Sequence, residues 1–268
     1  MKKMMTALAA FTLVAGATAC SETADTEAAS TEAGSIAGEW KADIESASFE
    51  NDNRDWVLAD GQYQCNSCLP PYGFTADGKW QTVDRPGTDS QMIEVVDERT
   101  VKFSSRFKGE DTGSSTMTIS EDGQTATVEW TDLSGDTPVN GKSTFTRTAA
   151  GPEGSHAMSG KWTTANIDSI DEAGLKFTFA LDGDTLSNSG NGSSWTATLG
   201  GEPVAIEGDN SGTMVAVEKT GDNSYRETYS RDGETLSVTE LTVEGDKLKG
   251  VSTDSRDGSK VTWTATRQ

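Results

Sequence analysis

The chain has 268 residues, with 43 acidic against 22 basic side chains, a formal net charge of −21 and only 33% hydrophobic residues. Binding of a phosphate backbone needs clusters of Lys and Arg, so this charge argues against nucleic acid as a partner. The single histidine, His156, lies in a Gly- and Pro-containing segment, which argues against a catalytic site of the Ser-His-Asp or Cys-His kind.

The first nineteen residues have the pattern of an export signal. Met1-Lys2-Lys3 is followed by an apolar run from Met4 to Ala17, and small residues, Ala17-Thr18-Ala19, precede Cys20. A charged start, a short apolar core and small residues before a cleavage point are typical of a secretory signal. The run is shorter than the roughly 20 residues that a membrane-spanning helix needs. We therefore expect residues 1–19 to be a cleaved signal peptide.

The end of this signal resembles the lipobox of bacterial lipoproteins, although Ala17 stands where that family prefers Leu. The resemblance implies that Cys20 becomes the first mature residue and carries acyl chains, which together hold a protein firmly at a membrane. Because Ser21 rather than Asp follows the cysteine, it also implies an outer-membrane location in the cell envelope. The alternative is ordinary cleavage after Ala19, which leaves Cys20 as a free thiol.

The segment after the lipidation site is predicted to be a tether. Residues 21–37 contain four acids, no base, no aromatic residue and one large apolar residue, Ile36. Such a composition cannot bury enough surface to offset the entropy lost on ordering. We expect a disordered, lipid-anchored linker over residues 20–37.

An internal repeat organises the rest of the chain. Gly38-Glu39-Trp40 recurs as Gly160-Lys161-Trp162, and Thr146-Arg147 recurs as Thr266-Arg267, with three weaker matches between them in the same order. Landmarks at a nearly constant spacing indicate two copies of one structural unit. We predict β-repeat 1 over residues 38–149, a linker over 150–158 and β-repeat 2 over 159–268.

Apolar residues alternate with polar ones within each copy. The clearest runs are Val101–Phe107, Ala126–Thr131, Phe177–Leu181 and Val261–Thr266. A period of two is the signature of a half-buried strand. Asp-Gly pairs between the runs, such as Asp60-Gly61 and Asp232-Gly233, supply the positive φ angles of tight hairpin turns. No amphipathic helix is evident, so the sequence predicts an all-β fold of two antiparallel meanders.

A Gly-x-Trp in the first strand, a meander, and an Arg on the last strand resemble lipocalins and their calycin relatives. In that family the Trp closes one end of a β-barrel and the Arg lies across it. The resemblance implies barrel-closing pairs of Trp40 with Arg147 and of Trp162 with Arg267. The layout is also similar to uncharacterised lipocalin-like envelope lipoproteins. A β-sandwich, or one larger barrel shared by both repeats, is the structural alternative.

Two further cysteines stand close together in Cys65-Asn66-Ser67-Cys68. In an oxidising envelope such a pair favours a local disulfide. A zinc site needs two more ligands that the neighbourhood lacks, and a redox site wants the first cysteine at a helix N-terminus. The sequence here indicates a loop, so we predict a Cys65–Cys68 disulfide and no metal or other cofactor.

Two functions follow from this sequence. The first is a non-catalytic, envelope-anchored protein that binds a small apolar or amphipathic ligand inside a lipocalin-like barrel. Trp56, Trp80 and Trp195 lie outside the Gly-x-Trp motifs, and we expect them either to pack in the core or to line a ligand mouth. The second is a structural or interaction lipoprotein that presents a polar surface to a protein partner in the envelope.

Overall fold

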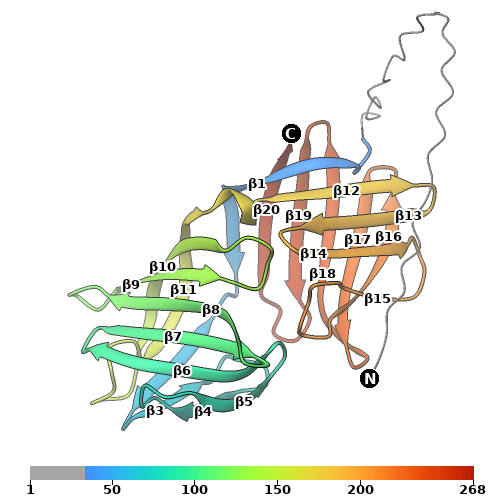
Figure 1. Cartoon of the computed structure of the whole chain (residues 1–268). Helices are drawn as coiled ribbons and strands as arrows, with labels where there is room; N and C mark the ends of the chain where they lie inside the picture. Colours follow the sequence, from blue (N-terminus) through green and yellow to red (C-terminus); the bar gives the residue numbers. More distant parts are fainter. Residues whose placement is uncertain (1–33) are drawn as a thin grey trace, which may run out of the picture. The chain divides into compact units, whose positions relative to one another are not determined.

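The computed structural model describes residues 34–268, which are almost entirely β-structure (Figure 1). The predicted signal peptide and Cys20 lie outside the described residues. The strands, with the 3-10 turn η1, are β1 Gly38–Glu50, β2 Arg54–Ala59, β3 Gln62–Cys65, β4 Tyr72–Thr75, β5 Gln81–Arg85, β6 Thr88–Asp97, β7 Thr100–Phe107, β8 Glu110–Ile119, β9 Thr125–Asp132, β10 Val139–Ala150, β11 Gly160–Ile170, η1 Glu172–Gly174, β12 Lys176–Asp182, β13 Thr185–Gly190, β14 Ser193–Thr198, β15 Val204–Ala205, β16 Met214–Gly221, β17 Ser224–Arg231, β18 Glu234–Glu244, β19 Lys247–Asp254 and β20 Lys260–Arg267.

The strands form two antiparallel sheets of ten strands each. Sheet A has the order β14-β13-β12-β1-β20-β19-β18-β17-β16-β15, and sheet B has the order β4-β3-β2-β11-β10-β9-β8-β7-β6-β5. Each sheet curls until its edge strands approach one another; in sheet A, Ser194 and Glu207 exchange two backbone hydrogen bonds across the seam. Closure hides the edges that an open sheet would expose. We call the two units barrel A and barrel B. The all-β, tandem-barrel prediction is confirmed, and the single larger barrel is wrong.

The two barrels exchange their first strands. β1 pairs with β12 and β20 in barrel A, whereas β11 pairs with β10 and β2 in barrel B. Barrel B is therefore continuous from β2 to β11, and barrel A combines β1 with β12–β20. The repeat boundaries predicted above, 38–149 and 159–268, do not coincide with these folded units.

The short connection between β10 and β11 explains the exchange. Residues 151–159 join these strands into a local antiparallel hairpin in which Arg147 lies opposite Trp162. Pairing with the preceding strand closes only a short loop, which costs little chain entropy, and sequential strands are usually neighbours. Because β11 occupies the first-strand position of barrel B, the equivalent position in barrel A is filled by β1.

Each barrel has its own core, closed at one end by a tryptophan. Trp40 in barrel A and Trp162 in barrel B are fully buried. The indole N–H of Trp40 donates to the carbonyl of Ile36, and that of Trp162 to the carbonyl of Met158, both at 2.9 Å. A buried indole N–H requires such an acceptor.

This arrangement corrects the limits of both predicted linkers. Ile36 and Met158, placed in the linkers over residues 20–37 and 150–158, are themselves fully buried core residues. Each packs in the barrel that its tryptophan closes. The folded part of the chain thus includes residues 34–37, which the composition of the whole segment assigned to the tether.

The tight turns lie where the Asp-Gly pairs predict them. Asp60 and Gly61 have φ angles of 50° and 69°, and Asp232 and Gly233 have φ angles of 52° and 83°. Two consecutive residues with positive φ give the turn twist that suits a two-residue hairpin.

Candidate functional site: a cavity in barrel B

The closed end of each barrel is sealed by an arginine over the tryptophan. The Arg147 guanidinium lies 4.0 Å from the centre of the Trp162 ring, and that of Arg267 lies 4.2 Å from that of Trp40. The predicted partners, Trp40 with Arg147 and Trp162 with Arg267, are therefore wrong. The four residues do form two Trp–Arg pairs, but the strand exchange gives each arginine the tryptophan of the other repeat.

Arg147 also ties down the segment before Trp162. Its guanidinium donates hydrogen bonds to the carbonyls of Gly123, Ala157 and Ser159, each at 2.5 Å. Arg267 makes the equivalent bonds to Ser35, at 2.7 Å, and to Ala37. Charged donors to several carbonyls make strong, directional contacts, so this end of each barrel is firmly closed.

The interior of barrel B is filled unevenly because small residues cluster in its inward-facing rows. Register places inward side chains of neighbouring strands side by side, since side chains alternate between the two faces. One row runs Asp132, Gly113, Ser105 and Gln91; the next runs Trp130, Ser115 and Phe103; the next contains Val128 and Met117. Glycine and serine in the first two rows leave space that the larger residues do not fill.

The result is a cavity of about 480 Å³. Its volume falls within the range of roughly 300–1,000 Å³ typical of small-molecule sites. The apolar side chains of its wall are five aromatic residues, a methionine and a valine: Trp56, Tyr63, Phe103, Trp130, Phe145, Met117 and Val128. Such a wall suits an apolar ligand, and the flexible Met117 can adapt to its shape.

The aromatic rings hold one another in place. Trp56 and Phe145 meet edge to face at 6.2 Å between ring centres, and Tyr63 meets Phe103 in the same way at 5.7 Å. These are favourable geometries for aromatic pairs. Burial raises the pKa of Tyr63, so its phenol stays protonated. The wall is thus preformed and uncharged over most of its area.

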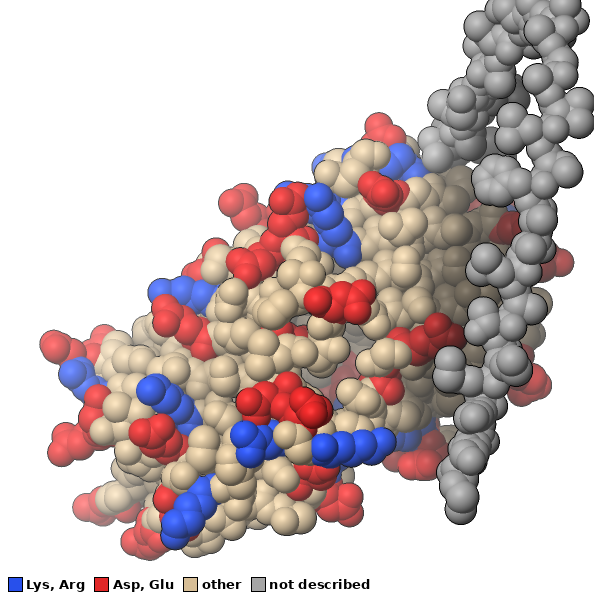
Figure 2. Space-filling model, in the orientation of Figure 1, with Lys and Arg blue, Asp and Glu red and all other residues tan. Residues whose placement is uncertain are grey.

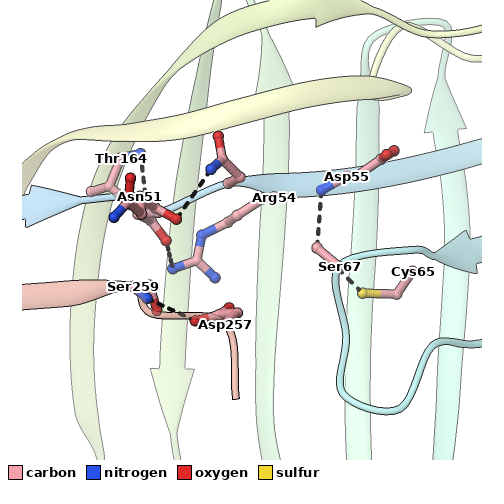
Figure 3. A network of polar contacts seen from close by, with 10 residues as sticks. Asn51, Arg54, Asp55, Cys65, Ser67, Thr164, Asp257 and Ser259 are labelled. Carbon is pink, nitrogen blue, oxygen red and sulfur yellow. Dashed lines mark hydrogen bonds and ion pairs between the residues drawn. The ribbon is translucent and has the colours of Figure 1, made fainter. Parts of the chain in front are cut away.

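One basic side chain, Arg54 at the start of β2, also lines the cavity. Its Nη2 lies 3.1 Å from Asp52 Oδ1, and its guanidinium lies 5.5 Å from the centre of the Phe145 ring. Asp52 Oδ2 in turn accepts hydrogen bonds from the backbone N–H and the hydroxyl of Thr164, at 3.0 and 2.5 Å (Figure 3). The exchanged strand β11, which contains Thr164, therefore helps to position Arg54.

The Cys65–Cys68 disulfide lies beside this corner of the site. Its S–S distance is 2.03 Å, which confirms the predicted pairing. Ser67, within the disulfide loop, accepts a hydrogen bond from the backbone N–H of Asp55 at 2.9 Å (Figure 3). The Asn66 N–H donates to the Asp55 carbonyl, also at 2.9 Å. The loop thereby fixes the residue that follows Arg54. The sequence predicted the disulfide but not its position next to a cavity.

Barrel A differs because bulky and polar side chains occupy its interior. Tyr225 and Glu227 are buried, and the Tyr229 hydroxyl donates to Glu227 Oε2 at 2.8 Å. Burial raises the pKa of Glu227 to about 7, although the Tyr229 hydrogen bond opposes the shift. A hollow of about 660 Å³ along β12–β14 has a wall mainly of glycine and small polar residues, which suits an apolar ligand less well.

The other residues singled out in the sequence have varied surroundings. Trp56 lines the cavity, Trp195 packs in the core of barrel A, and Trp80 lies under Arg106 at 3.8 Å.

His156 is held by the Asp97 carbonyl, 2.7 Å from its Nε2, and its Nδ1 accepts the Met158 N–H at 3.1 Å. Within residues 34–268, no group of three His, Cys, Asp or Glu is arranged to hold a metal ion.

Charged side chains of both signs are distributed over the surface (Figure 2). Acidic side chains are spread over the face seen in Figure 2, with Lys and Arg between them rather than gathered in a patch. Across the described part of the chain, no helix has the length and apolar character needed to cross a membrane.

Comparison with known proteins found no family model, no curated protein and no solved structure that matches the chain. No enzyme family or enzyme fold is therefore indicated. The structure itself defines the class: an all-β protein of two barrel-like sheets, one of which contains an aromatic-lined cavity.

Proposed function

We propose that the chain is a non-catalytic, envelope-anchored lipoprotein that binds a small apolar or amphipathic ligand in barrel B. The single observation that supports this function most is the 480 Å³ cavity with its aromatic and methionine wall. Removing apolar ligand surface from water contributes about 25 cal/mol per Å². A preformed wall adds to affinity because little protein entropy is lost on binding.

Filling the cavity tests this function. Ser115 faces the cavity from β8 between Trp130 and Phe103, so Ser115→Phe should occupy the ligand space. We expect at least a tenfold loss of affinity for a hydrophobic fluorescent probe, measured by titration, with the circular dichroism spectrum retained. Thr118→Phe, at an exposed position on the same strand, is the matched control. Equal binding by Ser115→Phe and the wild type would contradict the proposal.

A second function is favoured by the filled interior of barrel A and by the acidic surface. Barrel A can contribute through its outer face, as an interaction module for a protein partner in the envelope. Affinity capture from detergent-solubilised envelope tests this reading. A stoichiometric partner that barrel A variants lose would support it, and recovery of the chain alone would count against it.

The proposed location depends on Cys20, which lies outside the described residues. Cys20→Ser removes the thiol that would carry the lipid, so we expect the protein to move from the membrane fraction to the soluble envelope fraction. Fractionation with immunoblotting measures this, and Ser21→Ala serves as the control that keeps the thiol. Retention of Cys20→Ser in the membrane would overturn the lipoprotein assignment.

A further inference from the structure

The cavity of barrel B combines an apolar wall with one basic side chain, and we propose that Arg54 binds the carboxylate head group of an amphipathic ligand. The tail of that ligand lies among Trp56, Phe103 and Trp130. This inference rests on the proposed function and specifies the chemical class of its ligand, an acid with an apolar chain.

Arg54 uses only part of its hydrogen-bond donors in contacts within the described residues. A guanidinium carries five N–H donors, yet within residues 34–268 the contact of Arg54 with an acid is limited to the 3.1 Å approach of Nη2 to Asp52. Its Nε is enclosed and has no hydrogen-bond acceptor, so the donors open to a ligand are those of the two terminal nitrogens. By comparison, Arg147 places three of its N–H groups on carbonyl oxygens.

The nearby acids are already engaged by other donors. Asp52 Oδ2 accepts both the N–H and the hydroxyl of Thr164. Asp132, at the other side of the cavity, accepts the N–H and the hydroxyl of Ser134 on its Oδ1, at 2.8 and 2.5 Å. Hydrogen bonds of this kind favour the ionised form of a carboxylate. Arg54 is the basic group of the wall and can pair with an anionic head group.

The geometry of the wall fits a carboxylate better than a neutral head group. Arginine presents a planar fork of donors that matches a carboxylate, and its charge persists at all physiological pH values. Its setting is also partly apolar, because Phe145 lies under the guanidinium. The Arg54 side chain is 43% exposed, so its guanidinium is accessible to a ligand. The net charge of −21 would by itself favour cations, so a preference for an acid has to come from Arg54.

Three probes built on a ten-carbon chain separate the contributions of tail and head group: decanoate, decanol and decyltrimethylammonium. Binding is followed by calorimetry and by quenching of tryptophan fluorescence, on the full mature chain. We expect decanoate to bind about tenfold more tightly than decanol, because its carboxylate adds charge-assisted hydrogen bonds to Arg54. Arg54→Gln should abolish this preference while decanol affinity changes by less than about threefold. Arg226→Gln, an exposed arginine of barrel A, is the control of equal charge change.

The outcomes separate this inference from the function on which it rests. If neither decanoate nor decanol binds, the proposed ligand-binding function fails. If both bind equally and Arg54→Gln alters neither, barrel B binds apolar ligands but the head-group inference is wrong. Tighter binding of decyltrimethylammonium than of decanoate would also overturn it. Arg54→Lys, which keeps the charge but loses the fork, should retain part of the preference and shows that the site remains folded.

Discussion

The two Trp–Arg pairs are the residues on which closure of the barrels depends. Arg147 contacts the Trp162 ring and three backbone carbonyls. Lysine would keep the charge but cannot present a planar fork to several acceptors at once. For Arg147→Lys we expect barrel B to lose about 2–4 kcal/mol of unfolding free energy. Urea denaturation followed by fluorescence measures the change.

The control for this substitution is Arg226→Lys, at an exposed arginine that pairs with Glu218 and Glu240. Exposed ion pairs contribute about 0–1 kcal/mol. A loss of similar size in both variants would mean that Arg147 does not hold the closed end.

The buried carboxyl group of Glu227 should make barrel A sensitive to pH. Burial raises its pKa to about 7 in the folded protein, from an ordinary value of 4.5. The folded state then binds the proton more tightly than the unfolded state, so this contribution to stability is complete below pH 4.5 and is lost as pH rises through 7. Glu227→Gln keeps a neutral group of similar shape beside Tyr229 and removes the titration.

We therefore expect Glu227→Gln to be more stable than the wild type by about 3 kcal/mol at pH 8, and nearly equal to it at pH 4. Denaturation at a series of pH values measures the difference in unfolding free energy between the two proteins. Both have the same surface carboxylates, so the pH dependence due to those groups cancels in the difference. The pH-independent control is Thr239→Val, at the neighbouring buried position on β18. A constant difference between Glu227→Gln and the wild type across pH would contradict the prediction.

At the scale of strands and turns, most of the fold could be predicted from sequence. Alternation over Val101–Phe107 and Ala126–Thr131 identified β7 and β9, and Asp60-Gly61 identified the β2–β3 turn. These signals are local: a period of two and a positive φ are properties of a few consecutive residues. These signals can be recognised without knowing which strands pair with one another.

The partner of each first strand could not be predicted in this way. The repeats have the same Gly-x-Trp and Thr-Arg landmarks, so Trp162 could pair equally well with Arg147 or with Arg267 on sequence pattern alone. The choice depends on the entropy of the connection from β10 to β11, which favours the neighbouring strand. An interpretation based on the repeat alone assigned each Trp to the Arg of its own copy.

The cavity could not be predicted from the sequence either, because it too depends on which strands lie side by side. Gly113 and Ser115 are small or polar, so in a strand pattern they indicate a solvent-facing position. Only the register of β7, β8 and β9 places them together on the inner face, opposite the large rings of the wall. Arg54 gives no signal either, because its significance lies in the contacts that it lacks.

At the scale of the whole molecule, the strand exchange means that the segment forming barrel B interrupts the segment forming barrel A in the sequence. Barrel B, from β2 to β11, is inserted between β1 and β12 of barrel A. The inserted barrel contains all of its own closing residues: Trp162, Met158 and Arg147 are in one continuous segment. Barrel A needs β1, which is separated from its other strands by the full length of barrel B. The two barrels therefore differ in how they can fold.

This difference predicts which fragment folds alone. A fragment of residues 51–171 contains every strand of barrel B, so we expect it to unfold cooperatively and to bind the hydrophobic probe like the full chain. A fragment of residues 38–149, the boundary that the repeat suggests, lacks β11 and leaves Arg147 without Trp162. It should show no cooperative transition, because the barrel then lacks a strand and the closed end lacks its core. Thermal unfolding by circular dichroism and the dispersion of amide signals in NMR compare the two. Cooperative folding of 38–149, with an unfolded 51–171, would show that the strands pair within each repeat and that the exchange is wrong.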